Sequence, residues 1–447
     1  MKIQDLSSMV PWRARAPLFR TCSTVALGAA AAMNLAAAPA ELSDAAKAQY
    51  LATHMANVHA WSPSVEHKPT LGVSARYRSA ARGALGAIQG TSGGPPPLGT
   101  TVPYWTTSIT SPLDGATYTV SMVGSSPYAP VPTNTNVTYV PTAVRIHLDG
   151  FVLDPTAVSH CDTQSPARRF FNSPIFRPTG FISNGVNVSK VPGGTQLISA
   201  FQRANFWKAV QGTNYGVTLT PSRLDTIIVD WFPSDPQDFI AGVPDNCGGV
   251  VPIAVVNINE FNNELLAIAA AYATPAQVPV TLDNDVAIYV GNNTNNCCVL
   301  GYHNAVPVPG GTQLYAVGAY FDTNGVFGPD FADTTIWAHE LGELIDDPFV
   351  QSIPGAPGGT ANDLTPAWGH TGQVFGCQNN LEVGDPLTPD QAGHFKTFPI
   401  VGVGGFIYHY QDLAFHDWFY RTASTSTGGA GSFRDRLAGG GQPTICS

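Results

Sequence analysis

One long segment of this chain is acidic and contains no basic residue. Between Leu224 and Phe395, over 172 residues, there is no Lys or Arg, whereas 20 Asp and Glu residues fall in the same segment. Acidic groups that cannot pair with internal cations must stay solvated, become protonated or bind metal ions. Any fold of this chain has to place these carboxylates in one of those three environments.

Composition limits the class of protein. Apolar residues make up 44% of the 447 residues and charged residues only 12%, which indicates a folded chain with a sizeable core rather than a disordered chain or a coiled coil. The net charge of -10 argues against nucleic acid as a partner, because phosphate binding needs clustered Lys and Arg. Nothing in the sequence indicates an oligomeric state.

The first 40 residues are typical of a signal peptide. Arg13, Arg15 and Arg20 precede the apolar run 24–32, and residues 38–40 read Ala-Pro-Ala, which fits an A-x-A cleavage site. We therefore expect a secreted or periplasmic protein. The apolar run is too short to span a bilayer, and no later stretch is long enough, so no membrane span is expected.

Six cysteines follow the predicted signal peptide, at positions 161, 247, 297, 298, 377 and 446. An even number in an exported chain predicts three disulfides, with 15 possible pairings. A bridge between neighbouring residues is strained, so we expect Cys297 and Cys298 each to pair with another cysteine. A four-cysteine zinc site is the weaker alternative, because the sequence contains no C-x-x-C spacing.

The remaining chain divides into two parts. Residues 41–100 end in a Gly/Pro-rich stretch and are predicted to be a flexible N-terminal spacer, or a pro-region folding over an acidic site. Residues 101–447 mix short Val, Ile, Thr and Tyr-rich runs with amphipathic stretches, which predicts a strand-rich α+β domain or two lobes meeting at a cleft. The predicted strands are 116–123, 142–148, 224–231, 250–258, 286–290 and 313–321, and the predicted helices are 198–210, 262–273 and 334–346.

The segment 332–348, ADTTIWAHELGELIDDP, carries the main chemical motif. Asp333 is a natural N-cap for the predicted helix, which places His339 and Glu343 on one face, with Glu340 at its rim. This is the arrangement of H-E-x-x-H zinc hydrolases, in which the first Glu is the general base, with Glu343 replacing the second His. With 11 His and seven Glu in the chain, the chance expectation for H-E-x-x-E is only a few in a thousand. A solvated polar face is the alternative.

A third ligand is expected in the segment 376–387, GCQNNLEVGDPL. Only five Glu residues follow Pro96, and Glu382 is one of them, so we expect it to complete the site, with Asp385 as the acceptor that orients the imidazole of His339. One His and two carboxylates would neutralise a divalent ion, most plausibly zinc, and leave a position open for water. The rival ligands are His370, His394, His409, His416 and Asp385 itself. Asp346 and Asp347 are either helix-end carboxylates or a second, oxygen-only site.

Two further segments allow more than one interpretation. The run 282–296, LDNDVAIYVGNNTNN, has oxygen ligands suited to calcium but lacks EF-hand spacing, which favours a solvated turn. The aromatic segment 406–420 could line a cleft beside the metal, although at this density a packed core wall is favoured.

The motifs HELGELIDDP, LEVGDPL and YHYQDLAFHDWFYR resemble those of a group of secreted bacterial proteins of unassigned function, over most of the chain after Thr101. The pair of metal motifs is more distantly similar to plant phosphate-induced (Exordium-like) proteins, whose helix also reads H-E-x-x-E. A wider likeness is to gluzincin-type zinc metallopeptidases, which implies a zincin-like helix packed on a sheet. The chain departs from gluzincins at Glu343.

Two functions fit these observations. The first is an exported zinc-dependent, peptidase-like hydrolase that acts on a peptide or other carbonyl substrate, with the metal on His339, Glu343 and Glu382 and with Glu340 as general base on a metal-bound water. The second is a non-catalytic secreted or cell-surface protein with a closed, structural metal site. A third possibility is a cluster of carboxylates with raised pKa values and no metal.

Overall fold

The computed structural model describes residues 101–112, 114–159, 162–190, 194–244, 250–294, 297–322, 332–349, 368–369, 381–387, 397–434 and 444–445. All of them belong to one compact unit, Glu41–Ser447. The predicted signal peptide and the spacer or pro-region, residues 1–100, lie outside the described residues. Within the described ranges, no helix combines the length and apolar character needed to cross a membrane.

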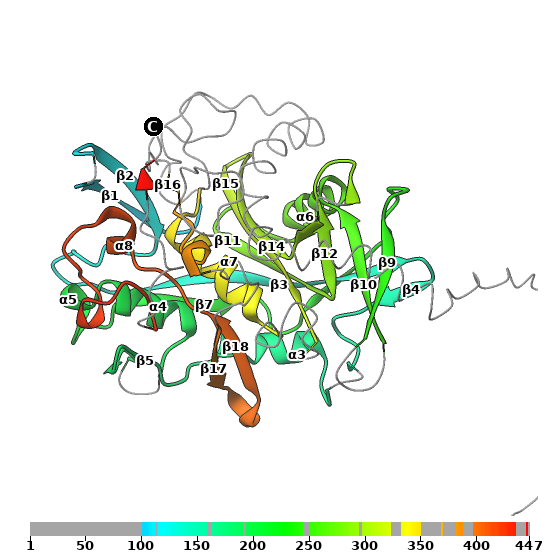
Figure 1. Ribbon diagram of the computed structural model, residues 1–447, viewed down its shortest axis with the longest axis horizontal. Helices are drawn as coiled ribbons and strands as arrows, with labels where there is room; N and C mark the ends of the chain where they lie inside the picture. The colour runs from blue at the N-terminus through cyan, green and yellow to red at the C-terminus, as the bar shows by residue number, and fades with distance from the viewer. Residues whose placement is uncertain are drawn as a thin grey trace, which may run out of the picture. The chain divides into compact units, whose positions relative to one another are not determined.

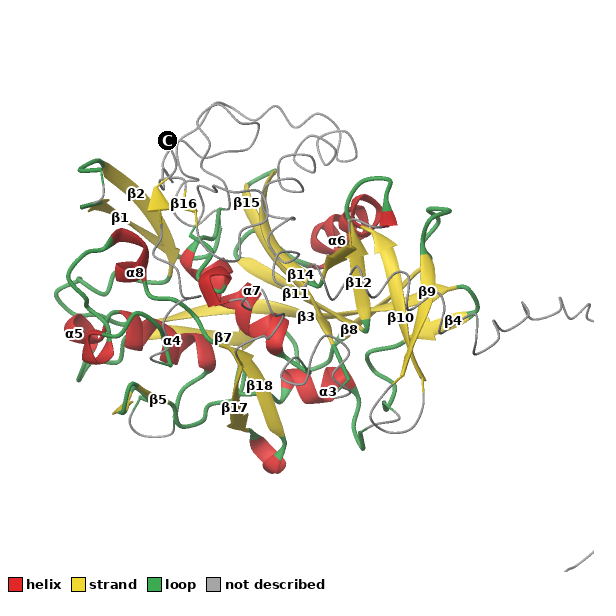
Figure 2. Ribbon diagram, viewed as in Figure 1, coloured by secondary structure: helices red, strands yellow, loops and turns green. Residues whose placement is uncertain are grey.

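A seven-stranded mixed sheet forms the centre of the unit (Figures 1 and 2). Its longest strand, β3, pairs in parallel with β11 on one side and with β7 and β8 in succession along its length. β11 pairs in parallel with β15, and β14 and β15 form an antiparallel hairpin. The strands are β3 (Asn134–Leu148), β4 (Phe151–Leu153), β7 (Gly216–Pro221), β8 (Ile227–Trp231), β11 (Gln277–Asn284), β14 (Gly301–Val308) and β15 (Gly311–Tyr320).

The other strands form smaller sheets. A four-stranded sheet has the order β13 (Cys297–Val299), β12 (Val286–Tyr289), β10 (Val250–Asn257) and β9 (Phe239–Pro244). Four two-stranded sheets pair β1 (Tyr104–Thr110) with β2 (Thr117–Val123), β5 (Ile182–Ser183) with β6 (Val186–Asn187), β16 (Trp368–Gly369) with β19 (Thr444–Ile445), and β17 (Thr397–Val401) with β18 (Ile407–Gln411).

The main helices are α3 (Pro166–Phe171), α4 (Leu197–Asn205), α5 (Trp207–Val210), α6 (Ile258–Tyr272), α7 (Thr335–Asp346) and α8 (His416–Tyr420). The mixed α+β class expected from the sequence is therefore confirmed. The six predicted strands correspond to β2, β3, β8, β10, β12 and β15, and the predicted helix 198–210 is interrupted at Phe206 between α4 and α5. Four strands of the large sheet, β4, β7, β11 and β14, were not predicted.

The two faces of the β14–β15 hairpin pack against different helices. Leu314 and Ala316 belong to the same hydrophobic cluster as Trp337 and Leu341 of α7. Tyr315 points to the opposite face, where its hydroxyl donates to Asn262 Oδ1 of α6 over 2.7 Å. Because side chains alternate along a strand, this hairpin separates two cores. Figure 1 shows α7, in yellow, lying across the strands of the seven-stranded sheet.

Helix α7 approaches this hairpin closely at two glycines. Gly301 and Gly318 are direct cross-strand partners in β14 and β15. A Cβ atom on Gly301 would overlap Ile336 and lie 2.9 Å from the carbonyl oxygen of Val317, and one on Gly318 would lie 3.0 Å from the indole of Trp337. The indole nitrogen of Trp337 donates to the carbonyl oxygen of Gly318 over 2.9 Å. The absence of side chains at this pair therefore sets the height of the helix above the sheet.

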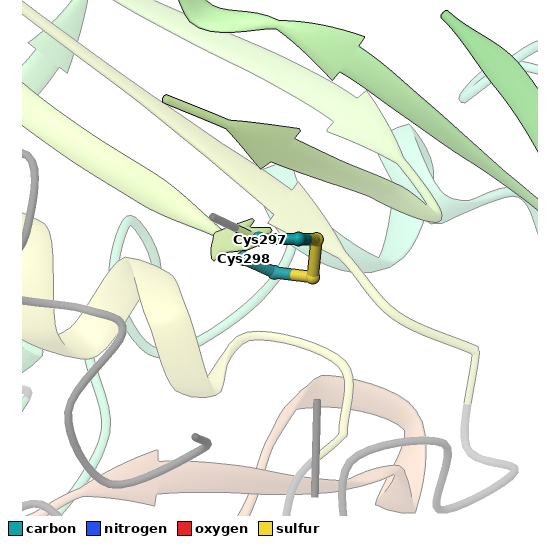
Figure 3. Close-up of a disulfide and its surroundings, with 2 residues drawn as sticks. All are labelled: Cys297 and Cys298. Carbon is teal, nitrogen blue, oxygen red and sulfur yellow. A yellow bond between two sulfur atoms is a disulfide. The ribbon is translucent and has the colours of Figure 1, made fainter. Parts of the chain in front are cut away.

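The expectation that Cys297 and Cys298 pair with other cysteines is wrong. The two residues form a disulfide with each other in β13, as Figure 3 shows. The expectation assumes the trans peptide bond that nearly all non-proline residues adopt. Here the bond is cis, and the two Cα atoms are 3.0 Å apart. The remaining cysteines, at positions 161, 247, 377 and 446, lie outside the described residues.

The run at 282–296 forms the solvated turn favoured from its sequence only in its second half, where residues 291–292 form a bend and Asn292 and Asn293 are exposed. Asp283 lies in β11, β12 follows from Val286, and both Asp283 and Asp285 are buried. The carboxylate oxygens of Asp283 have no hydrogen-bond partner among the described residues. Burial raises the pKa of Asp283 well above its usual range. Part of the acidic excess is therefore enclosed in the core.

The raised pKa of Asp283 gives a pH dependence of stability. The unfolded chain ionises this group near its ordinary pKa of about 3.9, whereas the folded chain keeps the proton to higher pH. Folding stability therefore falls as the pH rises between these two values. We expect Asp283→Asn to raise the free energy of unfolding at pH 8 by about 1 kcal/mol or more, and to change it much less at pH 4. Denaturant titration in EDTA measures this, with the exposed Asp225→Asn as control. Equal effects at both pH values would contradict it.

The glycine contact of α7 gives a second prediction. Gly301→Ala should lower the free energy of unfolding by about 1–3 kcal/mol, because the added methyl group overpacks the helix–sheet contact. Gly180→Ala is the matched control, since its Cβ would meet nothing within 4 Å. A Gly301→Ala protein that melts at the same temperature as the Gly180→Ala protein would show that the helix does not depend on this contact.

Candidate metal centre

Helix α7 begins one residue later than the sequence predicts. Thr334 occupies the N-cap position without a side-chain cap, and Asp333 precedes it with a positive φ of 44°. The Asp333 carboxylate accepts hydrogen bonds from the backbone N–H groups of Thr334 and His409, so it fixes the approach to the helix. All residues of α7 are buried, which places His339, Glu340 and Glu343 inside the protein.

A neighbouring amide determines the orientation of His339. The Nε2 atom of Gln411 donates to the carbonyl oxygen of Gly384 over 2.8 Å, which turns Gln411 Oε1 toward His339 Nδ1 at 3.0 Å. Because the amide oxygen can only accept, Nδ1 carries the proton of the neutral ring. The lone pair of Nε2 then faces Glu343 Oε1 at 3.0 Å and Asp385 Oδ1 at 3.4 Å.

The loop of residues 381–387 is attached to α7 by backbone hydrogen bonds. The N–H of Leu381 donates to Asp347 Oδ2 over 2.9 Å, and the N–H of Gly384 donates to Glu343 Oε1 over 3.0 Å. A Cβ atom on Gly384 would overlap the imidazole of His339. Glycine therefore allows the loop to lie against the histidine and brings Asp385 to its Nε2 atom.

A second histidine comes from the sheet. His303 lies in β14, two residues after Gly301, and points to the same face as that glycine, toward α7. Its Nδ1 atom is 3.4 Å from Glu340 Oε2 and 3.9 Å from Glu343 Oε2. The close approach of α7 at Gly301 is what lets a short imidazole reach both carboxylates.

Among the described residues, two groups of side chains have ligand atoms within 4.8 Å of one another. The first group is His339, Glu340 and Glu343, and the second group is His303, Glu343 and Glu382. The structure thus places His339, Glu340 and Glu343 together, as the spacing of the motif indicates. Glu382 lies with Glu343 but shares its group with His303 rather than with His339. Asp385 lies on the Nε2 side of His339, and Gln411 holds the orienting position on Nδ1 that the sequence assigns to Asp385.

The centre is buried and acidic. Its six side chains, those of the two groups and Asp385, are at most 3% exposed. Burial, together with the like charges of Glu343 and Asp385, raises the pKa of Glu382 well above its usual range. Burial also raises the pKa of Glu340, against the opposing effect of His303. Burial alone would lower the pKa of His303, but Glu340 and Glu343 raise it. Four enclosed carboxylates of this kind need protons or cations.

Other candidate ligands have structural partners instead. His409 Nδ1 is 2.7 Å from Asp333 Oδ2, and His416 Nε2 is 2.8 Å from Asp346 Oδ1. Asp346 also accepts a hydrogen bond from Gln202 Nε2 over 2.9 Å. Asp346 therefore acts as a carboxylate that ties α7 to α4 and α8. His370 and His394 lie outside the described residues. Neither metal-ligand group includes Asp283 or Asp285 of the run considered for calcium.

The aromatic segment 406–420 forms the core wall that its density favours. Tyr408, Tyr410, Phe415 and Phe419 are buried in the same hydrophobic cluster as α7. The segment 406–420 contributes one polar side chain to the centre, that of Gln411, which orients His339. Sequence reasoning missed both Gln411 and His303. The only local signal for His303 is a lone histidine in the apolar run CCVLGYHNAV, and nothing local marks Gln411.

Comparison with known proteins gives no match: no family model, no curated protein and no solved structure is similar to this chain at a significant level.

The contact between Gly384 and His339 is testable through metal binding. A methyl group at position 384 would displace the imidazole, so Gly384→Ala should lower the affinity for zinc about 10-fold or more. Gly431→Ala is the control, because its Cβ would meet only Trp418, at an ordinary 3.5 Å. Calorimetric titration of the metal-free proteins with zinc measures both. Equal zinc affinities for the two variants would show that the contact of the 381–387 loop with His339 does not contribute to metal binding.

Proposed function

We propose that this chain is an exported, metal-dependent hydrolase whose centre is built on the zincin-like helix α7. The observation that carries the proposal is the convergence of His339, Glu340 and Glu343 within 4.8 Å in a buried position. Their spacing on the helix is that of the H-E-x-x-H hydrolases. Export is supported by the signal-peptide pattern of residues 1–40.

The donor atoms fit a divalent first-row ion, with zinc as the first choice. An imidazole with Nδ1 protonated presents Nε2 as a ligand, and a carboxylate beside it supplies oxygen. Such an ion acts as a Lewis acid and lowers the pKa of a coordinated water. The scarcity of nearby positive charge supports the same choice, because residues 224–395 contain no Lys or Arg that could neutralise these carboxylates.

Each residue of the proposed centre then has a defined role. His339 and Glu343 hold the ion, and Asp385, 3.4 Å from His339 Nε2, completes its shell, whereas Glu382 lies with Glu343 on the side of His303. Glu340 accepts a proton from the attacking water, the role of the first Glu in the H-E-x-x-H hydrolases. The substrate class is a peptide or another carbonyl compound.

A structural metal site is the second candidate. The observation that favours it is burial, since none of the six side chains is more than 3% exposed. A structural ion has a closed shell of protein ligands, whereas a catalytic ion keeps a position for water. Metal content and hydrolysis, measured on the same preparation, separate the two candidates.

The test of catalysis is Glu340→Gln. This change keeps the shape of the side chain but removes the base, so hydrolysis of a peptide library should fall about 100-fold or more while zinc content is retained. Asp346→Asn is the matched control, because Asp346 is a buried carboxylate of the same helix outside both ligand groups. It should keep both zinc and activity.

Elemental analysis of the purified mature protein completes the test. A wild-type protein that binds zinc but hydrolyses no peptide or ester would favour the structural site. A wild-type protein that binds no divalent ion would rule out both candidates and leave a cluster of protonated carboxylates.

A further inference from the structure

The two oxygens of Glu343 face two different histidines. Oε1 lies 3.0 Å from His339 Nε2, and Oε2 lies 3.9 Å from His303 Nδ1. Glu343 is also the residue common to both ligand groups, and no group among the described residues contains both histidines. A carboxylate placed in this way has the geometry of a bridge between two ions.

We propose that the centre binds two divalent first-row metal ions, bridged by the carboxylate of Glu343. The first ion lies with His339 and Asp385, and the second lies with His303 and Glu382. This inference rests on the proposed function, because the first ion is the one assigned to hydrolysis. Two-metal hydrolytic centres have ions about 3.5–4 Å apart, a spacing that one carboxylate can bridge.

The distances between donor atoms at the site of the first ion fit a tetrahedral shell. Zinc lies about 2.0–2.2 Å from nitrogen and oxygen ligands, so neighbouring donors in a tetrahedral shell are separated by roughly 3.3–3.6 Å. His339 Nε2 is 3.4 Å from Asp385 Oδ1 and 3.0 Å from Glu343 Oε1. Small movements on binding would bring these three donors to the tetrahedral spacing.

The second position is supported by the environment of His303. This side chain is buried. Its Nδ1 atom is directed at carboxylates, with Glu340 Oε2 at 3.4 Å and Glu343 Oε2 at 3.9 Å. Glu382 belongs to the same ligand group. An imidazole that faces several carboxylates in this way is placed as a metal ligand would be.

The charge of the centre agrees with two ions rather than one. Glu340, Glu343, Glu382 and Asp385 carry four negative charges when all are ionised, and two divalent ions balance them. One ion would leave two of the four charges to be neutralised by protons or by a protonated His303, beside a chain segment that has no Lys or Arg. One ion would also leave one of the two histidines without a metal, since their ligand atoms fall in different groups.

The experiment counts metal ions in the whole mature protein. Metal-free protein is titrated with zinc and with Mn²⁺, followed by elemental analysis after removal of free metal. We expect two ions per chain in wild type. His303→Leu should bind one ion, and so should a Glu382→Gln variant, which tests the same position with a smaller change. His416→Leu is the matched control and should still bind two, because His416 is a buried histidine paired with α7 outside both groups.

The bridge itself is tested by electron paramagnetic resonance of the manganese-loaded protein. In fully loaded wild type, the signal of isolated Mn²⁺ should be reduced by coupling between the two ions, and in His303→Leu the signal of one isolated ion should return. Two uncoupled ions would overturn the bridge. One ion per wild-type chain would overturn this inference but leave the proposed function standing, whereas no bound ion would end both.

Discussion

Helix α7 reaches its position because two facing glycines leave no side chain beneath it. The contact at Gly301 and Gly318 brings the helix backbone close enough for His303 of the sheet to reach carboxylates of the helix. The hydrogen bond from Trp337 to the carbonyl oxygen of Gly318 holds the helix at that height. A larger residue at either position would push α7 away from the sheet and lengthen the distance from His303 to these carboxylates. The proposed chemistry therefore depends on a packing detail of the hydrophobic core.

This close packing has an electrostatic cost. Bringing the helix, the sheet and the 381–387 loop together encloses four carboxylates, and each pays a desolvation cost when ionised. The chain segment 224–395, which contains all four carboxylates, has no Lys or Arg to pair with them, so protons, His303 or metal ions compensate their charge. Metal binding and folding of this region are then linked, because an ion that binds only the folded chain stabilises it.

The sequence predicted those features that are encoded locally. The spacing of His339, Glu340 and Glu343 fixes one helical face, and Val, Ile, Thr and Tyr-rich runs marked three strands of the large sheet, β3, β8 and β15. Features that depend on long-range pairing were not predictable, since His303 meets α7 only through the register of β14 with β15. Gln411 reaches His339 through a separate hairpin. The pairing of Cys297 with Cys298 was missed for a local reason, namely the conformation of one peptide bond.

The amide of Gln411 has a chemical consequence for the metal ligand it orients. A carboxylate in this place would share the proton of the imidazole and make the ring a stronger electron donor. A neutral amide only accepts this hydrogen bond and does not ionise, so the neutral ring keeps the tautomer with the proton on Nδ1. An ion on such a ring receives less electron density and withdraws more from its remaining ligands. In the proposed metal centre, Gln411 thus makes His339 a weakly donating ligand, which favours an electrophilic ion.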